Sequence, residues 1–175
     1  QTERGLTDES WWVREAWAKR LDYTPTPQQI KRGLTDESWW VRKVWAIRQD
    51  YTLTSEYIDI GLNDPTEEIR LIWAKRLDYK PTPQQIERGL TDQSGLVRTA
   101  WAERPDYTPT PKQIERGLTD QDLFGFVRLA WAERMDYTPT PEQIERGITD
   151  ENALVCKAWA MRQDYTPTPK QVELG

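Results

Sequence analysis

The chain has 175 residues, a net charge of −5 and a mean hydropathy of −0.87. It lacks the basic patch typical of nucleic-acid-binding proteins and any apolar run long enough to cross a membrane. Ten tryptophans and seven tyrosines supply more apolar area than a disordered chain has. The absence of histidine excludes catalysis by an imidazole and metal binding through histidine ligands.

One motif recurs along the chain: a tryptophan followed five and six residues later by Asp-Tyr. Neighbouring copies are 28 residues apart, except for one interval of 30 residues. A fixed period in this range is the signature of a stacked repeat array. The sequence therefore predicts one domain over residues 1–175, a fragment of a longer array, with repeats at about 5–32, 33–60, 61–88, 89–116, 117–146 and 147–174.

The first repeat predicts an amphipathic helix over residues 9–20. Thr7 or Asp8 is placed to cap its start. Spacing residues by 100° puts Val13, Trp17 and Leu21 on the inward side, with Trp17 as the main buried anchor. Positions 11, 12, 15 and 19 then face outward.

A proline-rich turn follows, with the ring of Tyr23 expected over the turn and its hydroxyl at the surface. Thr26-Pro27-Gln28-Gln29 predicts a second, short helix over residues 27–32, because threonine at the cap and glutamine three residues later form a capping box. We expect Ile30 to face inward and Gly33 to adopt the left-handed conformation that ends many helices. The same cap recurs at Thr82, Thr110, Thr140 and Thr168. The fold class predicted is all-α, a right-handed α-solenoid of six helix–turn–short-helix repeats.

The pattern Leu6…Asp8…Val13-Arg14…Trp17-Ala18 resembles HEAT-like repeats, especially the leucine-rich repeat variant, and the resemblance covers all six repeats. It implies that an aspartate and an arginine six residues later form a ladder of ion pairs between successive repeats. Two features depart from the family: the repeat is longer, and tryptophan occupies a position that normally holds a smaller residue. The ladder residues would be Asp8/Arg14, Asp36/Arg42, Asp64/Arg70 and Asp92/Arg98.

Internal repetition separates structural from functional candidates. A residue present in every repeat is needed by every repeat, so the Arg20-type and Asp22-type side chains are expected to form structural pairs. Function is expected at positions that vary, and apolar residues on the polar side of a helix indicate a binding surface. The alternative, that the outward tryptophans fold back over the preceding loop, stays open. The partner-binding candidates are Trp11, Trp12, Trp39, Trp40, Ile47, Leu71, Phe124 and Phe126.

Two breaks in the pattern lie near the C-terminus. The fifth repeat has two extra residues around Phe124 and Phe126, which are expected to bulge from one edge, either as a contact site or through neutral drift. Cys156 is the chain's one cysteine and occupies the place of a ladder arginine, where it is expected to be a small buried substitute. A lone cysteine forms no internal disulfide, which favours a cytoplasmic location.

The sequence favours a non-enzymatic scaffold that binds a protein or peptide through its outward aromatic stripe. We find no catalytic, cofactor-binding or metal-binding constellation. Two alternatives remain open: a nucleic-acid-binding HEAT-like array, and a structural protein that associates with itself end to end. The partner's identity is not indicated.

Overall fold

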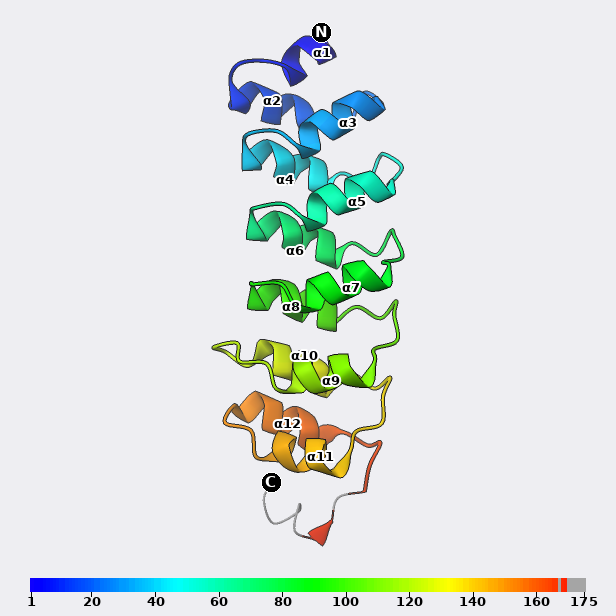
Figure 1. Cartoon of the computed structure of the whole chain (residues 1–175). Coiled ribbons are helices and arrows are strands. Elements are labelled where there is room, and N and C mark those ends of the chain that lie inside the picture. Colours follow the sequence, from blue (N-terminus) through cyan, green and yellow to red (C-terminus); the bar gives the residue numbers. More distant parts are fainter. Residues whose placement is uncertain (167, 170–175) are drawn as a thin grey trace. The chain divides into compact units, whose positions relative to one another are not determined.

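The computed structural model describes residues 1–166 and 168–169, and this part of the chain folds into helices joined by loops, without strands (Figure 1). The predicted all-α solenoid is confirmed, since successive helix pairs stack on one another within each of two compact units, residues 1–80 and 81–175. The single-domain prediction stays a prediction. The helices are α1 (Thr2–Leu6), α2 (Trp11–Ala18), α3 (Pro27–Leu34), α4 (Trp39–Ile47), α5 (Ser55–Leu62), α6 (Glu67–Lys75), α7 (Pro83–Leu90), α8 (Gly95–Ala102), α9 (Pro111–Leu118), α10 (Phe126–Glu133), α11 (Pro141–Ile148) and α12 (Ala153–Met161).

Two kinds of helix alternate along the chain. We call the even-numbered helices, α2 to α12, the Trp helices and the odd-numbered helices, α1 to α11, the Gly helices, after the residues that join them. In the first unit the Trp helices α2, α4 and α6 follow one another, and in the second α8, α10 and α12 do so (Figure 1). Apart from the five-residue α1, the helices have eight or nine residues, so the two kinds differ less in length than the sequence suggests.

The predicted capping boxes of the Gly helices are confirmed. Thr26 accepts a hydrogen bond from the Gln29 amide, while the Gln29 side chain accepts one from the Thr26 amide. This reciprocal pair satisfies two amides that the helix itself leaves unpaired. The same boxes begin at Thr82, Thr110 and Thr140. The helix predicted to begin at Thr168 continues outside the described residues.

The predicted start of the first Trp helix is wrong by two residues. Thr7 ends α1 instead, where its hydroxyl donates to the Glu3 carbonyl at 2.9 Å. The Asp8 carboxylate accepts from the Ser10 amide at 2.9 Å, which forms a turn ahead of α2 and not a cap. At the other end α2 stops at Ala18, so the 100° spacing does not extend to Leu21, whose side chain is exposed.

The core of each repeat is a tryptophan held against a glycine. Trp45, Trp73, Trp101, Trp131 and Trp159 are at most 1% exposed, while Trp17 in the first repeat is half-buried. A Cβ atom added to Gly33 would lie 2.1 Å from Nε1 of Trp45, and the other repeats have the same geometry. The left-handed conformation predicted for Gly33 is wrong, because this glycine lies inside α3, where it lets the indole approach the backbone.

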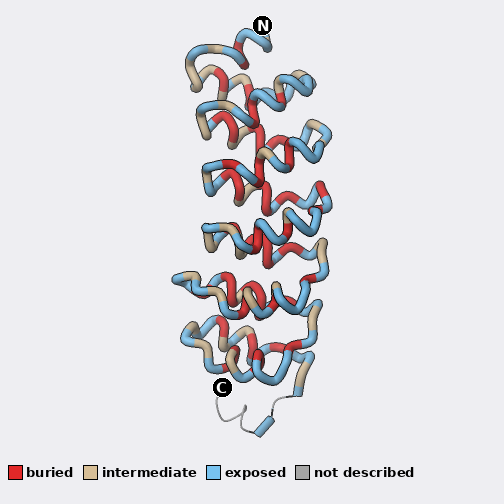
Figure 2. Tube along the Cα trace, in the orientation of Figure 1, coloured by how far each residue is buried: buried red, intermediate tan, exposed pale blue. Residues whose placement is uncertain are grey.

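The tyrosine of each repeat closes the end of its Trp helix. The Tyr51 hydroxyl donates to the Trp45 carbonyl at 2.9 Å, and Tyr107 and Tyr137 make the same bond within their repeats. The surface position predicted for these hydroxyls is wrong, because each one turns inward to donate to a carbonyl of its Trp helix. The last carbonyls of a helix need such donors from outside the helix. Figure 2 shows that the buried residues of each unit gather on the helices.

These tyrosines predict a loss of stability at high pH. Burial raises the pKa of Tyr51, Tyr107 and Tyr137 from 10.0 to about 12. Above the ordinary pKa the unfolded chain releases protons that the folded chain retains, so the free energy of unfolding falls as pH rises toward the folded pKa. In a titration followed by tyrosinate absorbance, we expect these three to ionise later than in urea-unfolded protein. Identical curves for folded and unfolded protein would contradict this burial.

Candidate partner-binding surface

The ladder arginines join successive repeats. Arg14 donates to both carboxylate oxygens of Asp36 in the next repeat, at 2.8 and 2.9 Å, and its third nitrogen donates to the carbonyl of Asp8 at 2.9 Å. The guanidinium therefore bridges a carbonyl of its own repeat and a carboxylate of the next. The same bridging geometry joins Arg42 to Asp64, Arg98 to Asp120 and Arg128 to Asp150.

The other predicted ladder residues also contact the backbone. Arg70 donates to the Asp64 carbonyl at 2.9 Å, and Asp92 accepts from the Ser94 amide at 2.9 Å. Cys156 is half-buried, where a buried residue was expected, and its thiol donates to the Asp150 carbonyl at 2.9 Å. The thiol thus replaces the arginine's contact with its own repeat but provides no guanidinium for a following one.

A second set of arginines makes inter-repeat contacts that the sequence analysis missed. Arg48 pairs with Asp50, as expected for structural pairs, and also donates to the carbonyls of Ala18 and Arg20 in the preceding repeat, at 2.5 and 2.8 Å. Its guanidinium lies 4.9 Å from the ring centroid of Trp45. Arg134 and Arg162 make equivalent contacts. The spacing Trp-x2-Arg-x-Asp predicts the pairing of arginine with aspartate, but nothing in it predicts that the arginine also binds backbone carbonyls of the preceding repeat.

Four of the predicted partner-binding residues are tryptophans that lie close together on the first unit. Trp11 stacks on Trp12 with ring centroids 4.0 Å apart, and Trp39 stacks on Trp40 at 3.9 Å. The two pairs are joined by Trp11 and Trp40, whose rings are nearly parallel with centroids 6.4 Å apart. We call Trp11, Trp12, Trp39 and Trp40 the tryptophan platform. Trp12 is 67% exposed and Trp40 is 42% exposed, so indole surface remains open to solvent.

A groove lies at the other end of the same two helices. It has a volume of about 660 Å³, and Leu21, Val44 and Ile47 give it an apolar lining where the segment after α2 meets α4. Leu21 and Ile47 are 73% and 55% exposed. Lys19 and Asp50 are among the polar residues at its edge. The predicted Ile47 thus lines a real depression, and the predicted Leu71 is half-buried on the neighbouring helix α6.

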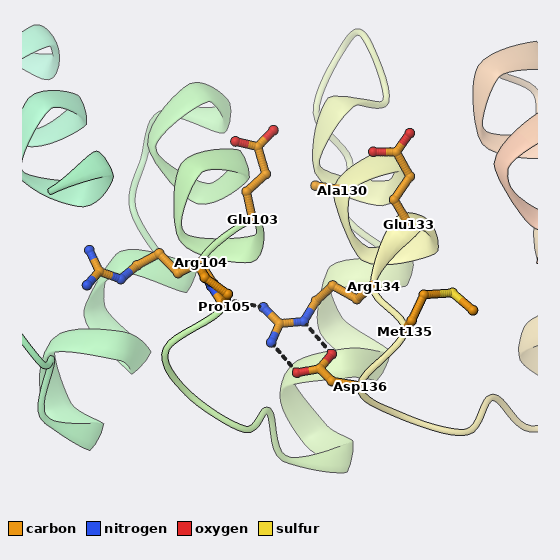
Figure 3. A pocket seen from close by; sticks show the side chains of 8 residues that line it. All are labelled: Glu103, Arg104, Pro105, Ala130, Glu133, Arg134, Met135 and Asp136. Carbon is orange, nitrogen blue, oxygen red and sulfur yellow. Dashed lines mark hydrogen bonds and ion pairs between the residues drawn. The ribbon is translucent and has the colours of Figure 1, made fainter. Parts of the chain in front are cut away.

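The second unit has the equivalent groove with a different lining. It lies between α8 and α10, has a volume of about 540 Å³ and includes Pro105, Ala130 and Met135 (Figure 3). Glu103 and Glu133 extend from the two helices toward the same side, while Arg134 is turned away toward Asp136. Glu103 and Glu133 occupy the repeat positions that Lys19 and Ile47 hold in the first groove, so the second groove is acidic where the first is basic and apolar.

The insertion of the fifth repeat forms an ordered loop ahead of α10. The Asp122 carboxylate accepts from the amides of Phe126 and Val127, and Gly125 adopts a left-handed conformation with φ of 67°. Asn152 anchors the loop by donating to the Phe124 carbonyl at 2.7 Å. Phe124 and Phe126 are 62% and 41% exposed, with ring centroids 5.7 Å apart. They lie in the second unit, separate in sequence from the tryptophan platform.

Within residues 1–166 and 168–169, no group of three or more cysteine, aspartate or glutamate side chains is arranged to hold a metal ion. In the same part of the chain, no helix combines the length and apolar character that crossing a membrane requires.

No protein-family model matches this sequence, and no curated protein matches it. Among solved structures, it is similar to a leucine-rich repeat variant with a repetitive structural motif, with a TM-score of 0.58 and 21% sequence identity over 99% of this chain and 78% of the other. The chain has the fold of a leucine-rich repeat variant. The family resemblance seen in the aspartate–arginine pattern is thereby confirmed at the level of architecture.

Proposed function

We propose that this chain is a non-enzymatic repeat scaffold that binds a protein or peptide through the Trp helices of its first unit. The observation that carries the proposal is the exposed tryptophan platform, continued by the apolar groove along the same helices. Tryptophan is the residue type most enriched at interface hot spots, and exposed apolar surface of this kind is uncommon on a monomeric protein.

The arginines count against the nucleic-acid alternative. Arg14, Arg42 and Arg48 are at most 9% exposed, and each already bonds a carboxylate. A nucleic-acid-binding array needs cationic groups that reach phosphates. Bases stacked on the platform would meet the ammonium of Lys43, but these buried and paired arginines would add no charge for the phosphates.

The proposal predicts a specific loss of binding in the variant Trp39→Ala/Trp40→Ala. Both tryptophans are at least partly exposed in the first turn of α4, so their removal should leave far-ultraviolet circular dichroism unchanged while abolishing capture of the partner protein from a nuclease-treated lysate. The matched control is Leu96→Ala/Leu154→Ala, which removes exposed apolar side chains from corresponding positions in the second unit.

Three outcomes of the capture experiment oppose the proposal. Retention of the partner by the folded double variant would place binding elsewhere. A partner lost on nuclease treatment would favour nucleic acid. Recovery of nothing except further copies of this chain would favour self-association.

A further inference from the structure

Exposed carboxylates precede both tryptophan pairs of the platform in sequence and also lie on the neighbouring helix α6. Glu9 and Glu37 are exposed just before α2 and α4, with Glu37 accepting a hydrogen bond from Arg14, and the positions of Trp11 and Trp12 are occupied in α6 by Glu67 and Glu68, both exposed. Because α4 and α6 are packed neighbours, these two carboxylates lie on the helix beside Trp39 and Trp40. The platform is thus an aromatic surface with an acidic rim.

The faces of the platform already hold one cation. The Nζ atom of Lys43 lies 5.6 Å from the ring centroid of Trp39 and 5.8 Å from that of Trp40. The electron-rich face of an indole attracts cations, and tryptophan does so best among the aromatic side chains. Lys43 shows where an ammonium sits on this surface, while the more exposed Trp12 leaves aromatic surface for a group from outside.

The apolar groove indicates a second feature of the ligand, an aliphatic side chain at a set distance from the cationic group. Residues 40 and 47 are seven positions apart on α4, which corresponds to about 10 Å along a helix. An extended peptide advances about 3.3 Å per residue, so about three residues cover that distance. The groove volume of about 660 Å³ is ample for one large aliphatic side chain.

We propose that the platform and groove bind an extended basic peptide, with an arginine on the indoles and a large aliphatic residue about three positions away in the groove. Arginine fits because its planar guanidinium stacks on aromatic rings while its N–H groups bond carboxylates such as Glu67 and Glu68. The acidic rim repels phosphates, which favours a basic protein segment over nucleic acid. This inference rests on the proposed function and specifies its ligand.

The test is isothermal titration calorimetry with a synthetic peptide that contains one arginine, two glycines and one leucine in that order between capped glycine ends. We expect binding that weakens at least about fivefold when citrulline, the neutral isostere, replaces arginine. Replacing leucine by glycine, or moving it next to arginine, should weaken binding by a similar factor.

Variants of the protein locate the two contacts. Trp40→Ala should weaken binding about tenfold, and Ile47→Ser should remove the preference for leucine. Glu67→Gln/Glu68→Gln should reduce the dependence of binding on salt. Leu96→Ala, on the second unit, should leave the affinity unchanged. Equal affinity for the arginine and citrulline peptides, or for wild type and Trp40→Ala, would overturn the inference.

A randomised peptide library separates failure of this inference from failure of the proposed function. Selected peptides that are neutral or acidic, and that require Trp39 and Trp40, would overturn the arginine assignment while the scaffold function stands. If no selected peptide depends on these tryptophans, the arginine assignment and the proposed scaffold function are both overturned. Tighter binding of a single-stranded oligonucleotide than of any peptide would also overturn both.

Discussion

Replacing Gly117 by alanine should lower the free energy of unfolding by about 3 kcal/mol, at the upper end of the usual cost of overpacking a core. The added Cβ would lie 2.0 Å from Nε1 of Trp131, a side chain that is 1% exposed and held on all sides. Helix propensity alone predicts the opposite sign, because alanine is favoured over glycine inside a helix by about 1 kcal/mol. Urea denaturation followed by circular dichroism measures the change.

Gly95→Ala is the matched control in the same unit. Gly95 begins α8, and its added Cβ would be 3.2 Å from Cβ of Asp122, a side chain in a surface loop. We expect a change within about 0.5 kcal/mol. A double-mutant cycle with Trp131→Leu assigns the cause, since alanine at 117 should cost less once the indole is gone, by about 1 kcal/mol or more. An equal loss of stability in Gly117→Ala and Gly95→Ala would show that the close contact between glycine and tryptophan does not limit the residue at position 117.

Replacing Arg48 by methionine should lower the free energy of unfolding by about 3–5 kcal/mol. The arginine is 5% exposed, and its loss strips the carbonyls of Ala18 and Arg20 of a shared donor while leaving Asp50 without its partner. Methionine keeps a similar length and apolar stem, so the effect reports mainly the lost hydrogen bonds. Urea denaturation again gives the magnitude.

Arg20→Met removes the same residue type from the first repeat. Arg20 also pairs with its aspartate, Asp22, but half of its side chain is exposed, and within the described residues it donates to no carbonyl of another repeat. The expected cost is about 1 kcal/mol or less, as for other exposed ion pairs. If the two arginine variants lose the same stability, the bonds between repeats contribute nothing measurable.

The sequence predicts the architecture well because repetition makes local signals redundant. The capping box at Thr26 requires only residues close in sequence, so it is readable without the fold. The hydrogen bonds of Arg48 to the carbonyls of Ala18 and Arg20 join residues 28 or more positions apart. Every residue has a backbone carbonyl, so the sequence does not indicate which of them accepts. The left-handed conformation predicted for Gly33 is wrong for a related reason: the role of this glycine is set by a neighbouring indole and not by its own backbone angles.

The candidate surface was predictable in part. Periodicity places Trp11, Trp12, Trp39 and Trp40 on the outer face, but the stacking of Trp11 near Trp40 depends on how α2 and α4 pack. The groove depends on Leu21, which the periodicity places on the wrong side because α2 ends at Ala18, before the predicted end of the helix. A helix periodicity gives the direction of a side chain only as far as the helix extends.

The most direct test of the binding surface is a nuclear magnetic resonance titration of the indole N–H signals with a bound peptide or partner. Each of the ten tryptophans has one such signal. We predict that the signals of Trp11, Trp12, Trp39 and Trp40 shift on binding, while those of the buried tryptophans Trp45, Trp73, Trp101, Trp131 and Trp159 stay in place. Shifts confined to the buried set, or binding that moves none of the four platform signals, would contradict the assignment of this surface.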